Sequence, residues 1–301
     1  MIDLRALAAL VERHGDDLDL PVTPFRVGER EIDTDARPAL MGIVNLSQDS
    51  WYRESIAADR ADAVRRAKVQ AAQGADFVDL GAESVVTTTA RVAADEQTAQ
   101  LAPVIAELTE AGVDTSVESY HPSTVEACLA AGARVVNLTG SVDDEAVFSL
   151  AAAHGASVVL CHIAGANARD LDEQRDYDDD PVPAMLDHFG PRVELAQRLG
   201  VASVAVDPGV GFTTPWLTSV EQRARFQSMA LLHSFRLRSL GVPVCHALPA
   251  AMHIFGEEVR IAEPFFAVLA SLGRTGVVRT HEIPRIRAVT EALATFEADH
   301  R

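Results

Sequence analysis

Residues 113–140 read VDTSVESYHPSTVEACLAAGARVVNLTG and contain the unit that decides the fold. Two short runs rich in apolar and β-branched residues, 113–119 and 133–140, flank a segment of helical period at 123–132. Gly132 comes directly after that segment, at the position where a left-handed residue ends a helix. A strand, a helix and a second strand in this order indicate two parallel strands joined by a crossover helix.

The same pattern recurs along the chain, and it yields eight strand-like runs. These are residues 39–46, 75–82, 113–119, 133–140, 156–163, 202–209, 242–248 and 275–282. Several of the helical segments between them end in a glycine just before the next strand: Gly74, Gly112, Gly132, Gly155 and Gly200. Apolar strands that alternate with helices indicate a parallel sheet covered on both faces. Eight such units predict an α/β fold, a closed (β/α)₈ TIM barrel. An open doubly wound sheet is the alternative, but no GxGxxG follows the first strand.

The chain divides into two unequal parts. Residues 1–36 precede the first strand, and we expect a helix at 3–14 and a polar segment that cap the bottom of the barrel. Residues 37–301 form the barrel itself. The acidic run DLDEQRDYDDDP (170–181) follows the fifth strand, and we expect it to be a solvated, mobile loop because it is too charged to pack.

Composition excludes several classes of partner. The 26 basic and 44 acidic residues give a net charge of −18, which repels phosphate backbones and anionic lipid surfaces. We therefore expect no nucleic acid and no membrane as partners. Three scattered cysteines form no CxxC pair or disulfide framework. With no apolar run of about 18 residues and no signal peptide, the chain is expected to be a soluble cytoplasmic protein.

Polar residues gather at the predicted carboxyl ends of the strands, where barrel enzymes place their chemistry. They are Asn45, Asp49, Asp79, Glu83, Glu118, Asn137, His162, Asp207, Cys245, His246, Arg279 and His281. Asn137 and Asp207 each end an apolar run, where an amide or a carboxylate is not needed for packing. Together they present donors and acceptors suited to a flat heterocycle with amino, ring N–H and carbonyl groups. Of Asp79 and Glu83, four residues apart in DLGAES, we expect one to be structural.

The histidines and cysteines are open to other interpretations. No HxH or HExxH motif occurs, so a dedicated zinc site is the weaker hypothesis. Cys161 and Cys245 adjoin His162 and His246, but neighbours on a strand point to opposite faces. A Cys–His nucleophile pair is therefore not expected, and we expect the cysteines to pack outside the barrel.

Five segments resemble motifs of the dihydropteroate synthase family, and they occur in the family's order over about residues 39–290. They are MGIVNLSQDSWY (41–52), GADFVDLGAES (74–84), SVES followed by HPSTVEACLAAGARVVN (116–137), DPGVGF (207–212) and VVRTHE (277–282). The resemblance implies a pterin-binding TIM barrel, usually a homodimer. It also implies condensation of 6-hydroxymethyl-dihydropterin diphosphate with p-aminobenzoate, with release of pyrophosphate and with Mg²⁺ as the cofactor.

The resemblance also implies roles for individual residues. Asn45 matches the family's metal and diphosphate asparagine, Asn137 and Asp207 match pterin-recognising residues, and Glu118 stands where the family has a pterin-facing aspartate. Arg279 and His281 match the diphosphate-binding pair of the last strand. We therefore predict Asp207, Arg279 and His281 as catalytic, Glu118, Asn137, Asp207, His162 and His246 as substrate-binding, and Asn45 as the metal ligand.

The chain departs from the family at several places, and one is SQDSW (47–51), which stands where the family has TPDSF. Val85 and Val86 replace a Thr-Arg pair, and Leu138 replaces an aspartate. The Ser-Arg-Lys of the seventh strand is missing from VPVCHALPAAMHIFG (242–256), where His246 and His253 are candidate replacements for the cation. The only lysine of the chain, Lys68, falls in the first barrel helix.

These departures leave the reaction open. If active, the chain is expected to be a transferase of the dihydropteroate synthase type. The alternatives are a divergent paralogue with a different second substrate, a methyltetrahydrofolate-dependent methyltransferase, and an inactive regulatory pseudoenzyme.

Overall fold

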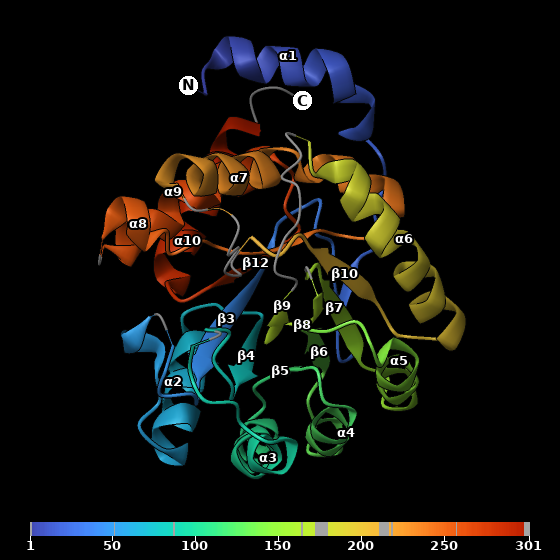
Figure 1. Cartoon of the computed structure of the whole chain (residues 1–301), viewed down its shortest axis with the longest axis vertical. Coiled ribbons are helices and arrows are strands. Elements are labelled where there is room, and N and C mark those ends of the chain that lie inside the picture. The colour runs from blue at the N-terminus through green and yellow to red at the C-terminus, as the bar shows by residue number, and fades with distance from the viewer. Residues whose placement is uncertain are drawn as a thin grey trace.

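Eight parallel strands form a barrel surrounded by helices (Figure 1). The computed structural model describes residues 2–50, 52–86, 88–163, 165–171, 180–210, 217, 219–256 and 258–297. The barrel strands are β3 (Ala39–Asn45), β4 (Phe77–Gly81), β5 (Thr115–Ser119), β6 (Val135–Leu138), β7 (Ser157–Cys161), β10 (Val204–Asp207), β11 (Cys245–Ala247) and β12 (Val277–Thr280). Each lies within one of the eight predicted runs, and the TIM barrel is confirmed.

The strand order closes the sheet into a ring. Neighbouring strands follow the order β10-β7-β6-β5-β4-β3-β12-β11. The first and last strands of this series meet in a parallel bridge between Val206 and Val244, where the Val206 N–H donates to the Pro243 carbonyl at 3.1 Å. Because all strands are parallel, their carboxyl ends meet at one mouth.

Helices cover the outside of the barrel. They are α1 (Leu4–His14), α2 (Arg60–Ala72), α3 (Ala94–Glu110), α4 (Pro122–Ala130), α5 (Asp144–Ala153), α6 (Val182–Leu199), α7 (Val220–Leu232), α8 (Met252–Phe255), α9 (Val259–Leu272) and α10 (Ile283–Glu297), with 3₁₀ turns η1 (Gly15–Asp17), η2 (Arg53–Ser55) and η3 (Ser234–Leu240). Gly200, with a φ of 84°, ends α6 as expected, and the other four predicted glycines also have positive φ. Within the described residues, no helix combines the length and apolarity needed to cross a bilayer.

The residues before the first barrel strand form a hairpin at the bottom of the barrel and a helix on its outer layer. Strands β1 (Phe25–Val27) and β2 (Arg30–Ile32) form a hairpin whose apolar side chains are buried in the lower interior of the barrel, together with Met41 and Phe77. Helix α1 instead contacts the outer layer, because Leu10 packs in the cluster that contains Phe235 of η3. The hairpin thus supplies the bottom of the barrel core.

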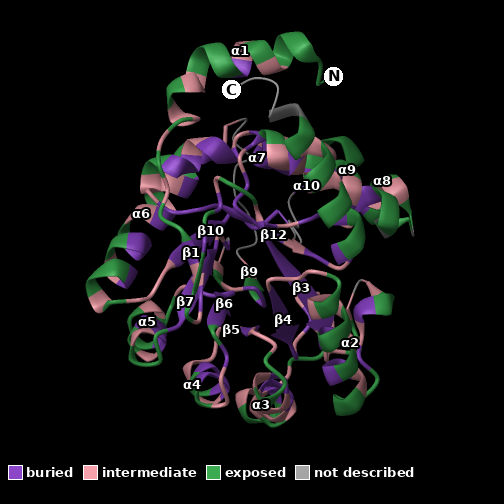
Figure 2. Ribbon diagram, turned by 180° about the vertical axis from the view of Figure 1, so that it is seen from behind, coloured by how far each residue is buried: buried purple, intermediate pink, exposed green. Residues whose placement is uncertain are grey.

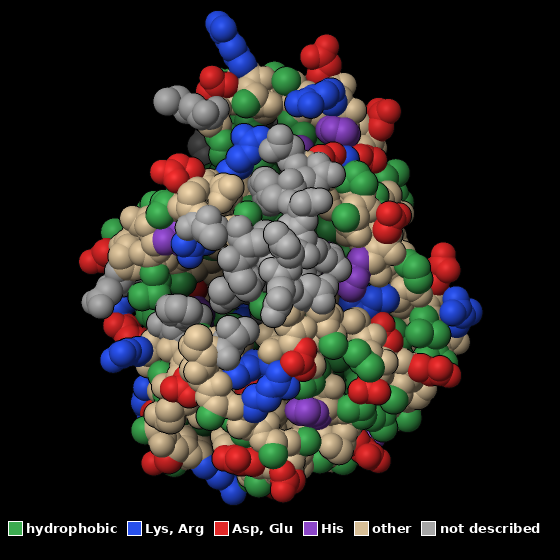
Figure 3. All heavy atoms as spheres, in the orientation of Figure 1, with side chains coloured by type: hydrophobic (Ala, Val, Ile, Leu, Met, Phe, Trp, Pro, Cys, Tyr) green, Lys and Arg blue, Asp and Glu red, His purple; other side chains and the backbone are tan. Residues whose placement is uncertain are grey.

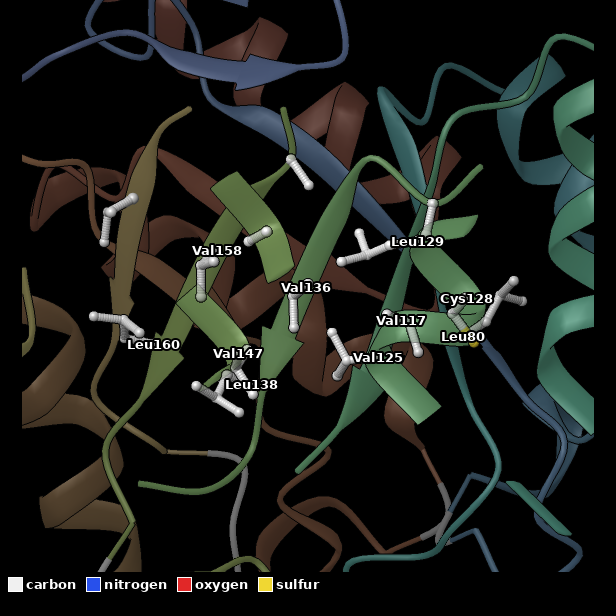
Figure 4. Close-up of a cluster of buried hydrophobic side chains, with 14 of the residues drawn as sticks. Leu80, Val117, Val125, Cys128, Leu129, Val136, Leu138, Val147, Val158 and Leu160 are labelled. Carbon is white, nitrogen blue, oxygen red and sulfur yellow. The ribbon is translucent and has the colours of Figure 1, made fainter. Parts of the chain in front are cut away.

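The main core lies between the strands and the surrounding helices. Val117, Val136 and Val158, from three adjacent strands, point outward into the cluster that Val125 and Cys128 of α4 complete (Figure 4). Burial of one such side chain contributes roughly 1.5–3 kcal/mol. Figure 2 shows the same division, with buried residues along the strands and exposed residues on the outer faces of the helices. This rigid frame holds the strand ends in place.

The predicted acidic loop is described only at its ends. Asp170 and Leu171 form strand β9, which pairs with β8 (Gly165–Asn167). Residues 172–179, on which the expectation of a solvated loop rests, lie outside the described residues. On the face drawn in Figure 3, acidic side chains are spread among arginines and do not gather into one patch.

Candidate active site

The two-residue alternation of the barrel strands selects the side chains of the site. On β6, Val135 belongs to the lower interior of the barrel, and Asn137 follows it on the same face, nearer the mouth. The same step leads from Phe77 to Asp79, from Ala205 to Asp207 and from Val277 to Arg279. Four polar groups from distant parts of the sequence therefore converge inside the mouth of the barrel.

Asp79 is the centre of this polar cluster. Its Oδ2 accepts hydrogen bonds from Asn137 Nδ2 at 2.9 Å and from Arg279 Nε at 2.8 Å, and its Oδ1 accepts one from the Ser116 hydroxyl. Arg279 Nη2 also donates to Glu118 Oε2 at 2.5 Å. One guanidinium thus joins two carboxylates. A buried charge without a partner costs several kcal/mol, so each of these groups depends on the others.

Burial alters the protonation of two carboxyl groups in the cluster. It raises the pKa of Glu118 to about 7, against the opposing charge of Arg279, and the nearby Asp79 raises it further. Burial also raises the pKa of Asp207 to about 6, although the Gly209 N–H donates to Asp207 Oδ1 at 2.8 Å. At neutral pH Asp207 is mainly ionised, while Glu118 changes between a donor and an acceptor of hydrogen bonds.

A cavity of about 520 Å³ lies above this cluster. Its size falls in the range of small-molecule sites. Glu118 and Arg279 line its floor, whereas Asn137 and Asp207 lie behind them and are each only 3% exposed. Arg279, which lines the cavity, donates to the same oxygen of Asp79 as Asn137 does.

Asn45 and His281 line the same cavity. Asn45 Nδ2 donates to the hydroxyls of Ser50 (3.0 Å) and Ser55 (2.6 Å), which leaves Oδ1 as its ligand atom. His281 Nδ1 lies 2.6 Å from Glu263 Oε1, and a carboxylate at this nitrogen orients the ring and leaves Nε2 for a ligand. The structure therefore brings Asn45, Glu118, Arg279 and His281 together around one space.

His162 and His246 are not among the described residues that line this cavity, and their binding of substrate stays a prediction. His246 is fully buried between the barrel and the outer helices, where its Nε2 lies 2.5 Å from the Ser234 hydroxyl. Burial lowers its pKa to about 3. The His162 ring packs edge-on against His188 and Phe189 of α6, at centroid distances of 4.8 and 6.0 Å.

Cys161 and Cys245 correct another expectation, because their side chains point into the barrel. Cys161 Sγ lies 3.3 Å from Asn137 Oδ1, and Cys245 belongs to the lower interior. Adjacent residues on these strands do point to opposite faces, as predicted, but the cysteine points inward and the histidine outward. Both faces of such a strand are apolar, so hydrophobicity alone does not tell which face is inside. Burial raises the pKa of both thiols well above its usual value, which disfavours the thiolate that a nucleophile requires.

Residues 242–256, which lack the family's Ser-Arg-Lys, form β11 and α8 and line the cavity from Ala247 to His253. Ala251 has a left-handed backbone with φ of 43°, a strained conformation that is common at functional sites. Burial and then the charge of Arg223 lower the pKa of His253, which disfavours its role as a replacement for the missing cation. Arg223 itself, from α7, lines the cavity.

Three important residues were not identified as site residues from the sequence. Asp79 was considered only together with Glu83, of which one was expected to be structural. Glu83 does have a local role, since it accepts hydrogen bonds from the Val92 N–H and the Tyr120 hydroxyl. The two-residue step from Phe77 is the signal that could have identified Asp79. Glu263 lies on α9, and its partner His281 follows the next strand, while Arg223 lies on α7. No local pattern marks either residue.

Residues 41–249 match the family model for pterin binding enzymes. The dihydropteroate synthase of Bacillus subtilis is 31% identical over 210 residues, covering 68% of this chain and 67% of that protein. A probable bifunctional folylpolyglutamate synthase/dihydropteroate synthase of Haloferax volcanii is 31% identical over 276 residues, 87% of this chain. The chain spans about a third of the length of this bifunctional protein, 32%.

Solved structures show the same similarity. A dihydropteroate synthase of Thermus thermophilus in complex with 4-aminobenzoate is 26% identical, with a TM-score of 0.71 over 90% of this chain and 97% of the Thermus chain. A dihydropteroate synthase of Yersinia pestis has a TM-score of 0.78 at 21% identity, over 92% of this chain and 100% of the Yersinia chain. The latter likeness supports the fold.

Proposed function

The chain belongs to the pterin-binding enzyme family, and on that premise we propose that it is a dihydropteroate synthase. In this reaction p-aminobenzoate displaces the diphosphate of 6-hydroxymethyl-dihydropterin diphosphate. The proposal rests on the buried pair Asn137 and Asp207, which lie beneath the cavity. The cavity itself is lined by Asn45, Arg279 and His281. Relatives similar along most of this chain are dihydropteroate synthases.

The pterin end of the site is the interior of the barrel mouth. An ionised Asp207 can accept hydrogen bonds from the amino group and ring N–H of a pterin, and Asn137 can both donate and accept. Glu118 is one methylene longer than the family's aspartate, and it uses this length to reach Arg279 on β12. The longer side chain is thus accommodated by its hydrogen bond with Arg279.

Arg279 connects the two ends of the site. It is bound to Asp79 and Glu118, and Asn137 donates to the same oxygen of Asp79. We propose that an incoming pterin takes over the hydrogen bonds of Asn137 and Asp207, and that Arg279 then turns toward the diphosphate. A guanidinium can hold two oxygens of a diphosphate at once.

The residues present fit Mg²⁺ as an ion that arrives with the diphosphate. No described residues form a group of three or more His, Cys, Asp or Glu arranged to hold a metal. Mg²⁺ is often held by one or two protein oxygens together with substrate phosphates, and Asn45 Oδ1 can supply such a ligand. When bound, the ion would neutralise charge on the departing diphosphate.

The chemical step is a substitution at the pterin methylene carbon. The amine of p-aminobenzoate donates its electron pair to this carbon, the bond from carbon to the diphosphate oxygen breaks, and the amine loses one proton. Arg279 and His281, at the diphosphate end, stabilise the charge that develops on the leaving group. The walls of the cavity hold the two substrates in contact, which lowers the entropic part of the barrier.

We also propose that the chain is a homodimer and that α9 forms the interface. Ile261, Phe265, Val268 and Leu272 are spaced three or four residues apart and are all exposed, with Phe265 at 47%. An apolar stripe of this kind on a helix is typical of a contact surface. A second copy would cover it by symmetry.

The cysteines support the proposed cytoplasmic location. Cys128, Cys161 and Cys245 are all free thiols in the structure and are buried. Proteins of oxidising compartments more often pair their cysteines in disulfides. Fractionation of cells that express the chain checks this proposal, and recovery in a secreted fraction would contradict it.

A product assay tests the proposed function. The chain is incubated with dihydropterin diphosphate, p-aminobenzoate and Mg²⁺, and the condensed product and pyrophosphate are measured. Equal amounts of the two products are expected. Calorimetry with a pterin is run in parallel. Pterin binding without product would contradict the proposed reaction, and no binding by any pterin would contradict the site as well.

A further inference from the structure

A second cavity lies at the end of the barrel opposite the candidate active site. Its volume is about 360 Å³, within the range of small-molecule sites. Residues that directly precede β3, β4 and β12 line it: Thr34, Pro38, Gly74, Asp76, Arg274 and Thr275. These three strands are neighbours in the sheet, so the cavity lies at their amino ends. Helix α10 also lines it, with Arg287 and Leu293.

Arg274 stands at a position that glycine occupies elsewhere in the barrel. Before β4, β5, β6, β7, β10 and β11, the residue with a left-handed backbone that follows the helix or 3₁₀ turn is a glycine: Gly74, Gly112, Gly132, Gly155, Gly200 and Gly241. Before β12 it is Arg274, with a φ of 61°. A residue with a Cβ is strained in this conformation, and such strain is common where a ligand binds. The chain therefore bears strain that places a guanidinium at this cavity.

Three buried polar atoms of residues that line the cavity have no hydrogen-bond partner in the described part of the chain. They are Thr34 Oγ1, Thr275 Oγ1 and Arg274 Nε. The two threonines are only 8% and 6% exposed. A buried polar atom without a hydrogen bond is unfavourable, so such atoms usually meet water or a ligand. Three of them at one cavity indicate a wall that a polar ligand completes.

Two carboxylates that line the cavity are already held by other arginines. Arg37 donates two hydrogen bonds of 2.8 Å to Asp76, and Arg238 donates two to Asp35, at 2.8 and 3.0 Å. Arg274 Nη2 lies 3.9 Å from Asp35 Oδ1, which is beyond hydrogen-bond distance. Its side chain is 34% exposed, so its guanidinium can donate to an anion in the cavity.

The third carboxylate that lines the cavity belongs to α10 and has an arginine of its own. Glu291 Oε1 lies 3.4 Å from Arg287 Nε, and Arg287 Nη1 donates to the Gln73 carbonyl at 3.0 Å. This pair adds no net charge. Among the described residues, the surplus positive charge of the cavity therefore comes from Arg274.

We propose that this cavity binds the phosphate group of a small phosphorylated molecule and that Arg274 is its anchor. A phosphate offers several acceptor oxygens, and a guanidinium holds two of them at once. The hydroxyls of Thr34 and Thr275 can donate further hydrogen bonds. Leu40 and Leu293, which also line the cavity, offer apolar surface to the organic part of the ligand. The inference goes beyond the proposed function and does not depend on it, because the two cavities lie at opposite ends of the barrel.

Calorimetry in a phosphate-free buffer tests the site. Inorganic phosphate and phenyl phosphate are titrated into the wild type and three variants. The wild type is expected to bind both, and phenyl phosphate more tightly. Arg274→Gln should weaken binding roughly 10- to 100-fold, the range expected for lost hydrogen bonds to a charged group. Arg198→Gln is the matched control, because Arg198 is an exposed arginine 3.9 Å from the Glu194 carboxylate and does not line the cavity.

The third variant, His281→Gln, distinguishes this site from the mouth of the barrel. It should bind phosphate as the wild type does. Loss of binding in His281→Gln with retention in Arg274→Gln would place the anion at the mouth and overturn the site, as would equal losses in Arg274→Gln and Arg198→Gln. Binding of inorganic phosphate without phenyl phosphate would overturn the organic ligand and assign the cavity to the free ion.

Melting temperatures of Arg274→Gly supply the second measurement. Glycine removes the guanidinium and the backbone strain together, so the melting temperature without phosphate should equal or exceed that of the wild type. Phosphate should raise the melting temperature of the wild type, because it binds the folded state, but not that of the variant. A variant that melts lower without phosphate and is still stabilised by it would assign Arg274 to the frame of the barrel and overturn its role as the anchor.

Discussion

Replacement of Asp207 by asparagine tests the pterin site most directly. The side chain is 3% exposed, and it is ionised above its pKa of about 6. Asparagine keeps the shape but removes the charge and one acceptor. A hydrogen bond to a charged group contributes about 1.5–3 kcal/mol, and a pterin can donate two such bonds to Asp207. Because such losses do not add fully, we expect about 2–4 kcal/mol, or roughly 30- to 1,000-fold weaker binding.

The measurement is calorimetric titration of a pterin at pH 8, where wild-type Asp207 is ionised. Asp187→Asn, at an exposed position on α6 that does not line the cavity, makes the same change of charge and serves as the control. Melting temperatures show whether the variants fold. A folded Asp207→Asn protein that binds pterin within about threefold of the wild type would refute the assignment, since a factor of three corresponds to less than 1 kcal/mol.

The same site should respond to pH. Burial raises the pKa of Asp207 to about 6, so the carboxylate that accepts the pterin's donors is lost as the pH falls through this value. The part of the pterin affinity that Asp207 supplies should be constant above pH 7 and should fall about tenfold per unit well below pH 6. In Asp207→Asn this dependence should disappear, and an unchanged pH profile in the variant would assign the titration to another group.

The remaining predictions concern stability and assembly. Asp79→Asn leaves Arg279 with a weakened buried partner, and we expect the free energy of unfolding, measured with denaturant, to fall by about 3–5 kcal/mol. A loss below 1 kcal/mol would contradict the central role of Asp79. His246→Leu removes the contact with Ser234 and should lower stability by about 1–3 kcal/mol without changing pterin affinity. Weaker pterin binding would return His246 to the site. Phe265→Glu should yield monomers in sedimentation, and an unchanged mass would place the interface elsewhere.

Much of the site could be predicted because strand ends are visible in the sequence. Asn45, Glu118, Asn137, Asp207 and Arg279 all follow apolar runs, and the structure brings them to one mouth. The sequence does not show in the same way which face of each strand points into the barrel. A parallel strand covered on both faces is apolar on both, so a polar residue at its end can point either way. His162 and His246 show this, since each follows an inward-pointing cysteine and lies outside the barrel.

The sequence by itself determined the eight strand–helix units, the glycines that end several helices and the strand ends where polar groups collect. These features are local, because periodicity and backbone preference act over a few neighbouring residues. Only the tertiary structure decided that Asp79 holds Arg279, that Glu263 orients His281 and that Arg223 faces the cavity. Each of these depends on how distant segments meet when the barrel closes.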